Sequence, residues 1–151
     1  MLTIIDEIEN RQTVRALTGF EFNWEIKGHF NALLFGAYVE NKIVGLVEFD
    51  RKDKELYNFM YLIEVHPDYR GSSVAGELLA WVGLDAFNQG FDGFVVFESK
   101  SANYQMYIEK YGAKPLRGRR LHFDTESTKR LIETYLGNTD GDTDSLRTKE
   151  S

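Results

Sequence analysis

Hydrophobic residues in the first half of the chain form short, β-branched runs that are typical of strands. A single residue, Asn41, separates two of these runs, so we predict an antiparallel hairpin there. Weaker helical patterns between the first two runs predict short helices at about residues 10–17 and 20–30, and a charged turn is expected at Arg51–Lys54. The predicted strands are Leu2–Ile8, Leu34–Glu40, Lys42–Phe49 and Leu56–Val65.

After residue 70 the hydrophobic period changes to that of helices. Val74, Leu78, Val82 and Ala86 follow the spacing of an amphipathic helix. Further along, the pattern predicts two more helices and two strands. These elements are a strand at Gly93–Phe97, a helix at Ser101–Tyr111, a strand at about Leu116–Phe123 and a helix at Thr125–Leu136. The order β-α-α-β-β-β-α-β-α-β-α predicts an α+β or mixed α/β sheet, antiparallel first and crossing over later.

The length of 151 residues is typical of one domain, and 42% hydrophobic residues are enough for a core. Residues 138–151 hold one large apolar side chain, Leu146, and four acids, so we predict a mobile acidic tail after a folded domain at 1–137.

Charge and composition exclude several classes of function. The chain has no cysteine and three histidines, so a disulfide framework and a structural metal are not expected. A net charge of -6 argues against binding nucleic acid, and a charged partner is expected to be a cation or a cationic peptide. The acidic start and the absence of a 20-residue apolar stretch lead us to expect a protein of the cytoplasm with no membrane segment.

The segment from Ile63 to Leu79 carries the most specific chemistry. A strand ends at a Pro turn, a loop with Arg70 and Gly71 follows, and a helix begins directly after it. Amides from Tyr69 to Gly76 are expected to lack partners and to form a seat for a phosphate or diphosphate. The small residues Gly71, Ala75 and Gly76 would let a ligand approach the backbone closely.

Two motifs resemble those of the GNAT N-acetyltransferase superfamily. Arg70-Gly-Ser-Ser-Val-Ala75 is similar to the family's acetyl-CoA-binding motif after a Val-x-Pro strand end. Tyr107-Ile-Glu-Lys-Tyr-Gly-Ala113 resembles the end of a later family helix. The resemblance covers about residues 34–115 and implies a sheet with two splayed strands that hold acetyl-CoA between them. It implies an N-acetyltransferase that acts on the primary amine of a small molecule or protein, without a metal, as a monomer or a homodimer.

The resemblance also implies a set of site residues. Glu64 would serve as a base, directly or through water, and Tyr107 or Tyr104 would give a proton to the departing thiolate. A role in packing competes for the two tyrosines, and a role in the turn competes for His66. Strand alternation argues against Glu64 if Val65 faces the substrate. The implied cofactor-binding residues are Val65, His66, Arg70, Gly71, Ser72, Ser73, Val74, Ala75 and Asn103.

Four features depart from the family pattern. Ile108 occupies the usual position of the general-acid tyrosine, Val96 that of a glutamate base found in one branch, and Ser73 that of a glycine. A helix at Thr125–Leu136 replaces the closing pair of strands. The alternative hypothesis is therefore a catalytically degenerate relative that binds a partner protein, with or without CoA.

Two further groups of side chains have open roles. The first group could contact the 3′-phosphate of CoA or an acidic partner, or form a solvated strand face; it comprises Lys114, Arg117, Arg119 and Arg120. The second group could line an acceptor pocket or pack in the core; it comprises Tyr57, Phe59 and Tyr61.

Overall fold

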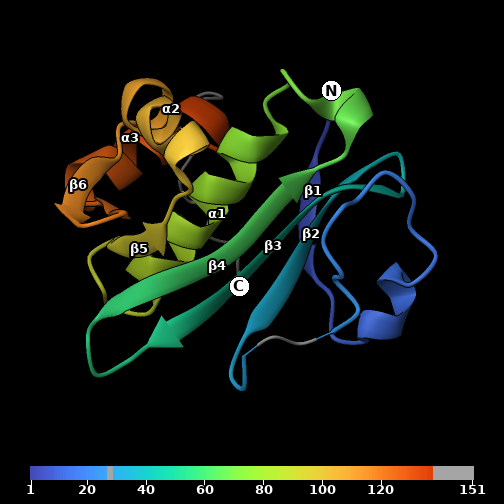
Figure 1. Ribbon diagram of the computed structural model, residues 1–151, viewed down its shortest axis with the longest axis horizontal. Helices are drawn as coiled ribbons and strands as arrows, with labels where there is room; N and C mark the ends of the chain where they lie inside the picture. The colour runs from blue at the N-terminus through green and yellow to red at the C-terminus, as the bar shows by residue number, and fades with distance from the viewer. Residues whose placement is uncertain (27–28, 138–151) are drawn as a thin grey trace.

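A seven-stranded mixed sheet forms the centre of the computed structural model, which describes residues 1–26 and 29–137 (Figure 1). The strand order is β1-β2-β3-β4-β5-β7-β6, and every neighbouring pair is antiparallel except the parallel pair β4–β5. The strands are β1 (Ile4–Glu7), β2 (Leu33–Val39), β3 (Lys42–Lys52), β4 (Tyr57–Val65), β5 (Val95–Glu98), β6 (Lys114–Arg117) and β7 (Arg120–Phe123). This architecture confirms the predicted fold class.

The parallel pair requires a crossover, which the helix α1 (Val74–Asn88) provides. The predicted hairpin is also present, because β2 and β3 pair in antiparallel register around a turn at Glu40 and Asn41. Both residues have positive φ angles, of 51° and 67°, as a tight hairpin turn requires.

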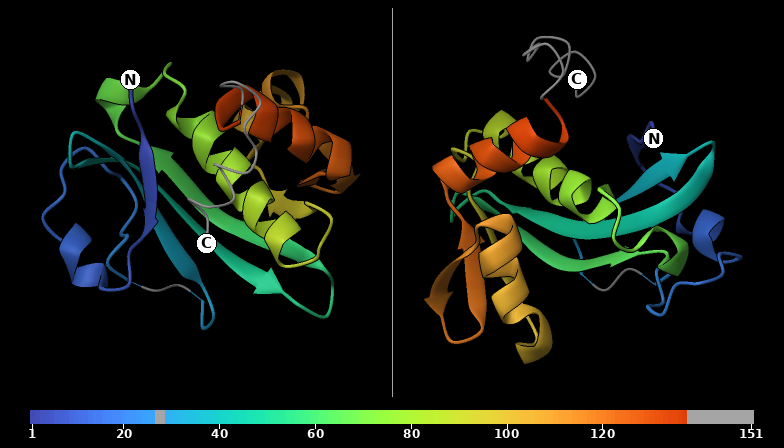
Figure 2. Two further views of the ribbon diagram at one scale, coloured as in Figure 1. Left: turned by 180° about the vertical axis from the view of Figure 1, so that it is seen from behind. Right: turned by 90° about the horizontal axis from the view of Figure 1, so that it is seen from above.

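Two helices, α1 and α3 (Thr125–Tyr135), lie on one face of the sheet, and the segment between β1 and β2 covers the other face (Figure 2). Two glycines of α1 allow the close contact between these helices. A Cβ built on Gly76 would overlap the Tyr135 ring, and one on Gly83 would overlap Thr128. The remaining helix, α2 (Ser101–Tyr111), follows β5 and ends at Gly112 in the left-handed conformation.

Two hydrophobic clusters stabilise the domain. The larger one fills the space between the sheet and α1, and Phe49, Phe97 and Phe123 are its largest fully buried side chains. The smaller cluster lies under the segment between β1 and β2, where it buries Ile8 and Trp24. Burial of apolar area on both faces is the main stabilising contribution.

The helices predicted before β2 were largely wrong. A single short 3-10 helix, η1 (Arg11–Val14), stands in place of the helix predicted at residues 10–17. Between residues 20 and 30, the part that the structure describes contains turns and bends but no helix. This segment is held by side chains instead: the Arg11 guanidinium donates to the Glu48 carboxylate at 2.7 Å and to the Trp24 carbonyl at 3.2 Å.

The single strand predicted at about Leu116–Phe123 is a hairpin of β6 and β7, with a turn at Gly118 whose φ is 58°. The closing pair of strands is therefore present, and α3 follows it rather than replacing it. The charged turn is also shifted, since β3 runs to Lys52 and the turn covers residues 53–56.

The predicted tail at 138–151 lies outside the described residues. Within the described ranges, none of the helices has the length and apolar character needed to cross a bilayer.

Candidate active site

The parallel strands β4 and β5 separate after three paired positions. Asn58 pairs with Val95, Phe59 with Val96 and Met60 with Phe97, and β4 then continues to Val65 without β5 beside it. A β-bulge lies at this point. Glu48 of β3 pairs with Leu62 and Phe49 with Met60, so Tyr61 has no paired residue in β3. A bulge bends the strand that carries it. The strands therefore open into a V beyond Met60.

A cavity of about 480 Å³ lies at this opening. Residues from β4, the N-terminal end of α1, α2 and the segment before β2 surround it together. Its walls bring together Glu64, Val65, Arg70, Ala75, Asn103 and Tyr107 among the predicted site residues. Six further lining residues were not predicted as site residues, namely Glu21, Phe22, Ile63, Leu79, Met106 and Tyr111.

The loop before α1 only partly forms the expected seat of free amides. The amides of Tyr69, Arg70 and Ser72 donate to loop carbonyls, and that of Val74 donates to the Ser72 hydroxyl at 3.3 Å. These four amides are therefore occupied, contrary to the prediction. Among the residues that the structure describes, no acceptor faces the amides of the other positions, which are Gly71, Ser73, Ala75 and Gly76.

Two residues of the predicted seat have structural roles. The Val74 side chain is fully buried in the core, and its amide is already bonded, so it offers a ligand neither group. The sequence led us to explain Gly76 by close approach of a ligand. In the structure the residue is small because the Tyr135 ring of α3 packs directly against it. Gly71 differs, since a Cβ there would meet nothing within 4 Å and the φ of +83° explains the glycine.

The Ser73 side chain turns along the helix. Its hydroxyl donates to the Glu77 carboxylate at 3.1 Å, four residues further on. Partial burial raises the pKa of Glu77, and the hydrogen bonds from Ser73 and Thr3 act in the opposite direction. The hydroxyl is therefore engaged beside the loop, while the Ser73 amide keeps no partner in the described chain.

His66 lies away from the cavity between β4 and α2. Its Nδ1 accepts a hydrogen bond from the Asp68 amide at 3.1 Å, and its ring packs edge-on against Phe20 and Tyr69. The residue lines a separate groove of about 760 Å³ beside the β2–β3 hairpin. The structure thus gives His66 the role of a turn cap.

Glu64 is buried, at 8% exposure, and its carboxylate accepts three hydrogen bonds. The amide of Glu21 donates to Oε2 at 2.6 Å, the amide of Phe22 to Oε1 at 3.2 Å, and the indole nitrogen of Trp24 to Oε1 at 2.7 Å. These bonds fasten the segment before β2 to the wall of the cavity. A base must keep a lone pair for the proton it takes, and these bonds compete for that lone pair.

Tyr107 lies in the cavity wall, although it stands one position before the residue expected from the family pattern. Its ring packs edge-on against Phe97 with centroids 4.9 Å apart. Burial, with a smaller contribution from Tyr111, raises the pKa of Tyr107 to about 12. Its phenol therefore keeps its proton at neutral pH and can donate a hydrogen bond into the cavity.

Two other groups of predicted residues also have definite positions. Phe59 and Tyr61 lie half-buried on the sheet face opposite α1, with centroids 5.0 Å apart, and His29 stacks on Tyr61 at 3.5 Å. Lys114 pairs with Asp124, and Arg120 with Glu98. Within residues 1–26 and 29–137, no group of three or more acidic or histidine side chains is arranged to hold a metal ion.

A splayed strand pair, with a loop and helix N-terminus at its edge, defines a domain of the acyl-CoA transferase class. The family model described as the Acetyltransferase (GNAT) family matches residues 3–113. The chain therefore belongs to the GNAT acetyltransferase family, as its motifs predicted.

Solved structures share this fold at low sequence identity. A GNAT-family acetyltransferase from Staphylococcus aureus Mu50 has a TM-score of 0.52 and 17% identity, over 63% of this chain and 68% of that one. The AtaTR complex bound with acetyl-CoA has a TM-score of 0.61 and 14% identity, over 86% and 98%. The KacTA–DNA complex has a TM-score of 0.64 and 10% identity, over 88% and 99%. No curated protein matches the sequence.

Proposed function

We propose that this protein transfers the acetyl group of acetyl-CoA to a primary amine. The observation that carries the proposal is the cavity in the V, because it joins the end of β4 to Arg70, Ala75, Asn103 and Tyr107. The cavity thus joins an anion site at the start of α1, the part of β4 that has no β5 beside it, and the Tyr107 phenol. A structure with acetyl-CoA bound is known for a protein of the same fold.

The diphosphate of acetyl-CoA would bind at the N-terminal end of α1. Four amides there lack an acceptor in the described chain, namely those of Gly71, Ser73, Ala75 and Gly76. The positive end of the helix dipole adds to their attraction for an anion. Arg70, exposed at the edge of the cavity, supplies a full positive charge.

The reaction would be a direct attack of the amine nitrogen on the thioester carbonyl carbon. A new C–N bond forms, the C–S bond breaks, and the sulfur leaves with its electron pair. Backbone groups at Val65 would orient the acetyl carbonyl, and the Tyr107 hydroxyl would donate a hydrogen bond to the departing sulfur. The amine loses a proton to solvent, directly or through ordered water in the cavity.

Glu64 would act in this scheme as a positioning residue. Its carboxylate holds Glu21, Phe22 and Trp24, and so fixes the side of the cavity that faces the acceptor. This role replaces the direct base suggested by the family resemblance, because three donors already compete for the carboxylate.

Two measurements test the proposal together. Acetyl-CoA at about 100 times its dissociation constant should stabilise the protein by about 2.7 kcal/mol, which raises the Tm by roughly 5–10 °C. Release of CoA thiol should then exceed background for at least one amine in a panel of small amines and peptides. Stabilisation without turnover of any amine would favour the degenerate relative that binds a partner, and no stabilisation would overturn the proposed site.

A further inference from the structure

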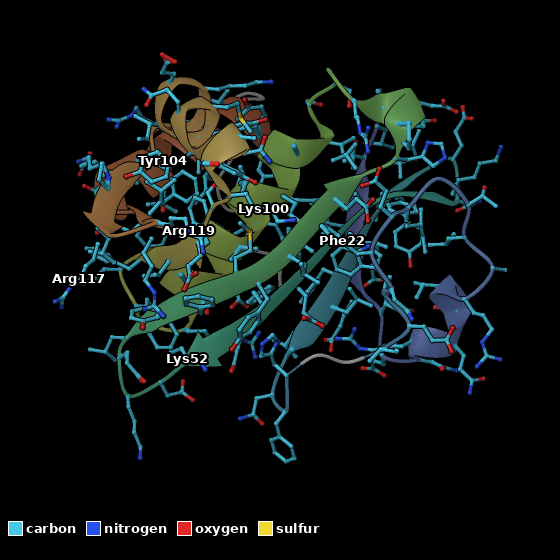
Figure 3. All side chains as sticks on the ribbon, in the orientation of Figure 1. Phe22, Lys52, Lys100, Tyr104, Arg117 and Arg119 are labelled. Atoms are coloured by element: carbon cyan, nitrogen blue, oxygen red, sulfur yellow. The ribbon has the colours of Figure 1, made fainter. Side chains whose placement is uncertain are left out.

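The mouth of the V is bordered by cations on the side of β5 and β7. The last pair between β4 and β5 is Met60 with Phe97, so the chain from Glu98 onward borders the opening. Lys100 lies three residues beyond Phe97, at the start of α2. The Ser99 amide donates to the Arg119 carbonyl at 3.1 Å, which places Arg119 next to the same opening. Figure 3 shows Lys100 and Arg119 along one border of β4, with Lys52 along the other.

These cations are not balanced by nearby acids. Glu98 pairs with Arg120 at 3.5 Å and Asp50 with Lys52 at 3.0 Å, while the Glu64 carboxylate in the cavity wall accepts from three neutral donors. Lys100, Arg117 and Arg119 are exposed, and in the part of the chain that the structure describes no carboxylate lies within 4.0 Å of them. The border that Lys100 and Arg119 form is therefore locally positive on a protein whose net charge is -6.

An aromatic floor lies beside the cations. Phe59 and Tyr61 are adjacent and half-buried on the face of β4 opposite α1, with centroids 5.0 Å apart, and the His29 ring stacks on Tyr61. The Arg120 guanidinium lies 5.1 Å from the centre of the Phe59 ring, and the Lys52 ammonium 5.9 Å from that of Tyr61. Aromatic rings bordered by cations suit an extended ligand with both apolar and anionic groups.

We infer that the acceptor is an amine on an acidic polypeptide segment, whose carboxylates lie against Lys100 and Arg119. The inference rests on the proposed function, since it names the acceptor of that reaction. It replaces the cationic partner expected from net charge, because the local charge at the mouth has the opposite sign. An acidic peptide suits this small patch better than a long nucleic acid, which the overall negative charge would repel.

Binding of a fluorescein-labelled hexaglutamate peptide, followed by anisotropy in the presence of saturating acetyl-CoA, tests the inference without requiring turnover. The variant Lys100→Gln/Arg119→Gln should weaken binding about 5-fold or more. The control variant Lys42→Gln/Lys129→Gln removes the same charge from the β2–β3 hairpin and α3, and its affinity should stay within about twofold of wild type. Acetyl-CoA affinity, titrated separately, should be unchanged in both.

Four results would overturn the inference. Two of them would reduce the effect to nonspecific attraction: hexaglutamine that binds as tightly as hexaglutamate, and an equal loss of affinity in the two variants. Loss of acetyl-CoA affinity in Lys100→Gln/Arg119→Gln would assign the cations to the coenzyme instead. A ten-residue oligothymidine that binds more tightly than hexaglutamate would point to nucleic acid. The acetyl-CoA titration of the wild type tests the proposed function independently of all four.

Discussion

The Glu64 carboxylate lies 2.7 Å from the indole nitrogen of Trp24, and this contact joins β4 to the segment before β2 across the edge of the cavity. Trp24 is itself buried in the smaller hydrophobic cluster, so the hydrogen bond links packing on one face of the sheet to the site. Phe22, two residues earlier, lines the cavity and lies across β4 from Lys100 and Tyr104 (Figure 3). The position of the segment before β2, which forms one wall of the cavity, therefore depends on Glu64.

Glu64→Gln should lower the free energy of unfolding by about 1–3 kcal/mol, because an amide offers one acceptor where the carboxylate offers two oxygens to three donors. Urea unfolding measures this loss. Trp24→Phe, which removes only the indole donor, should cost less.

The kinetics of Glu64→Gln test the positioning role separately. If Glu64 only positions the cavity wall, the variant should raise the KM of the acceptor more than it lowers kcat. A stable Glu64→Gln protein whose kcat falls about 100-fold at unchanged KM would restore Glu64 as the base.

Tyr107→Phe should lower kcat by about 10- to 1000-fold, because the departing sulfur loses its hydrogen-bond donor. The Kd of acetyl-CoA should change by less than about threefold, since the ring still packs on Phe97. Tyr104→Phe is the matched control on the same helix, because Tyr104 lies outside the cavity lining, and its kcat should stay near that of wild type. Equal effects in the two variants would contradict the assignment.

The raised pKa of Tyr107 makes a separate prediction about pH. A phenol with a pKa of about 12 stays protonated through pH 10, whereas an ordinary tyrosine would be half ionised there. The rate at saturating substrates should therefore not fall between about pH 8 and pH 10. A decline in that range that is present in wild type and absent in Tyr107→Phe would show that the phenol titrates lower.

Ala75→Glu should weaken acetyl-CoA binding by about 50-fold or more, because it places a carboxylate in the cavity beside the seat for the diphosphate. Ala75→Gln has nearly the same volume without the charge and should weaken binding much less. Isothermal titration calorimetry measures both. Equal losses would mean that bulk rather than charge excludes the ligand, and no loss in either would place the diphosphate elsewhere.

Asp124 caps α3 and should stabilise the fold in a pH-dependent way. Its carboxylate accepts from Lys114 and from the Ser127 amide and hydroxyl, and these contacts hold its pKa well below the usual range. Because the folded-state pKa is the lower one, the stabilisation is complete above the unfolded value of about 3.9 and is lost as the pH falls through and below it. Asp124→Ala should cost about 1 kcal/mol at pH 7.

Asp124→Asn separates the cap from the charge, because asparagine is also a good N-cap. It should be less stable than wild type at neutral pH, and the difference should shrink between about pH 4 and pH 2. Urea unfolding across that range provides the measurement. A difference that grows as the pH falls would contradict the lowered pKa.

Much of the fold was predictable because local patterns determine it. The hairpin around Asn41, the crossover helix α1 and the later helices each follow from hydrophobic period and turn residues. The segment before β2 was not predictable in this way. Its conformation depends on Arg11, Glu48 and Glu64, which lie 13 to 43 residues from their partners in the sequence. Periodicity cannot report such distant contacts.

The site was predictable in outline and wrong in detail. The motif from Arg70 to Ala75 located the helix N-terminus, but it did not reveal that turn bonds occupy the amides of Tyr69, Arg70 and Ser72. The Val-x-Pro position suggested a ligand contact for His66, whereas its ring caps the turn on another face. The role of Tyr107 could not be settled by counting, because which side of α2 faces the cavity depends on how the helix packs.

Backbone NMR of the labelled protein during an acetyl-CoA titration tests whether free amides at the start of α1 hold the diphosphate of acetyl-CoA. The amide signals of Gly71, Ser73, Ala75 and Gly76 should move most, while those of the exposed residues Glu126 and Glu133 on α3 should not move. Unchanged signals at these four positions with millimolar acetyl-CoA would show that these amides do not hold the diphosphate.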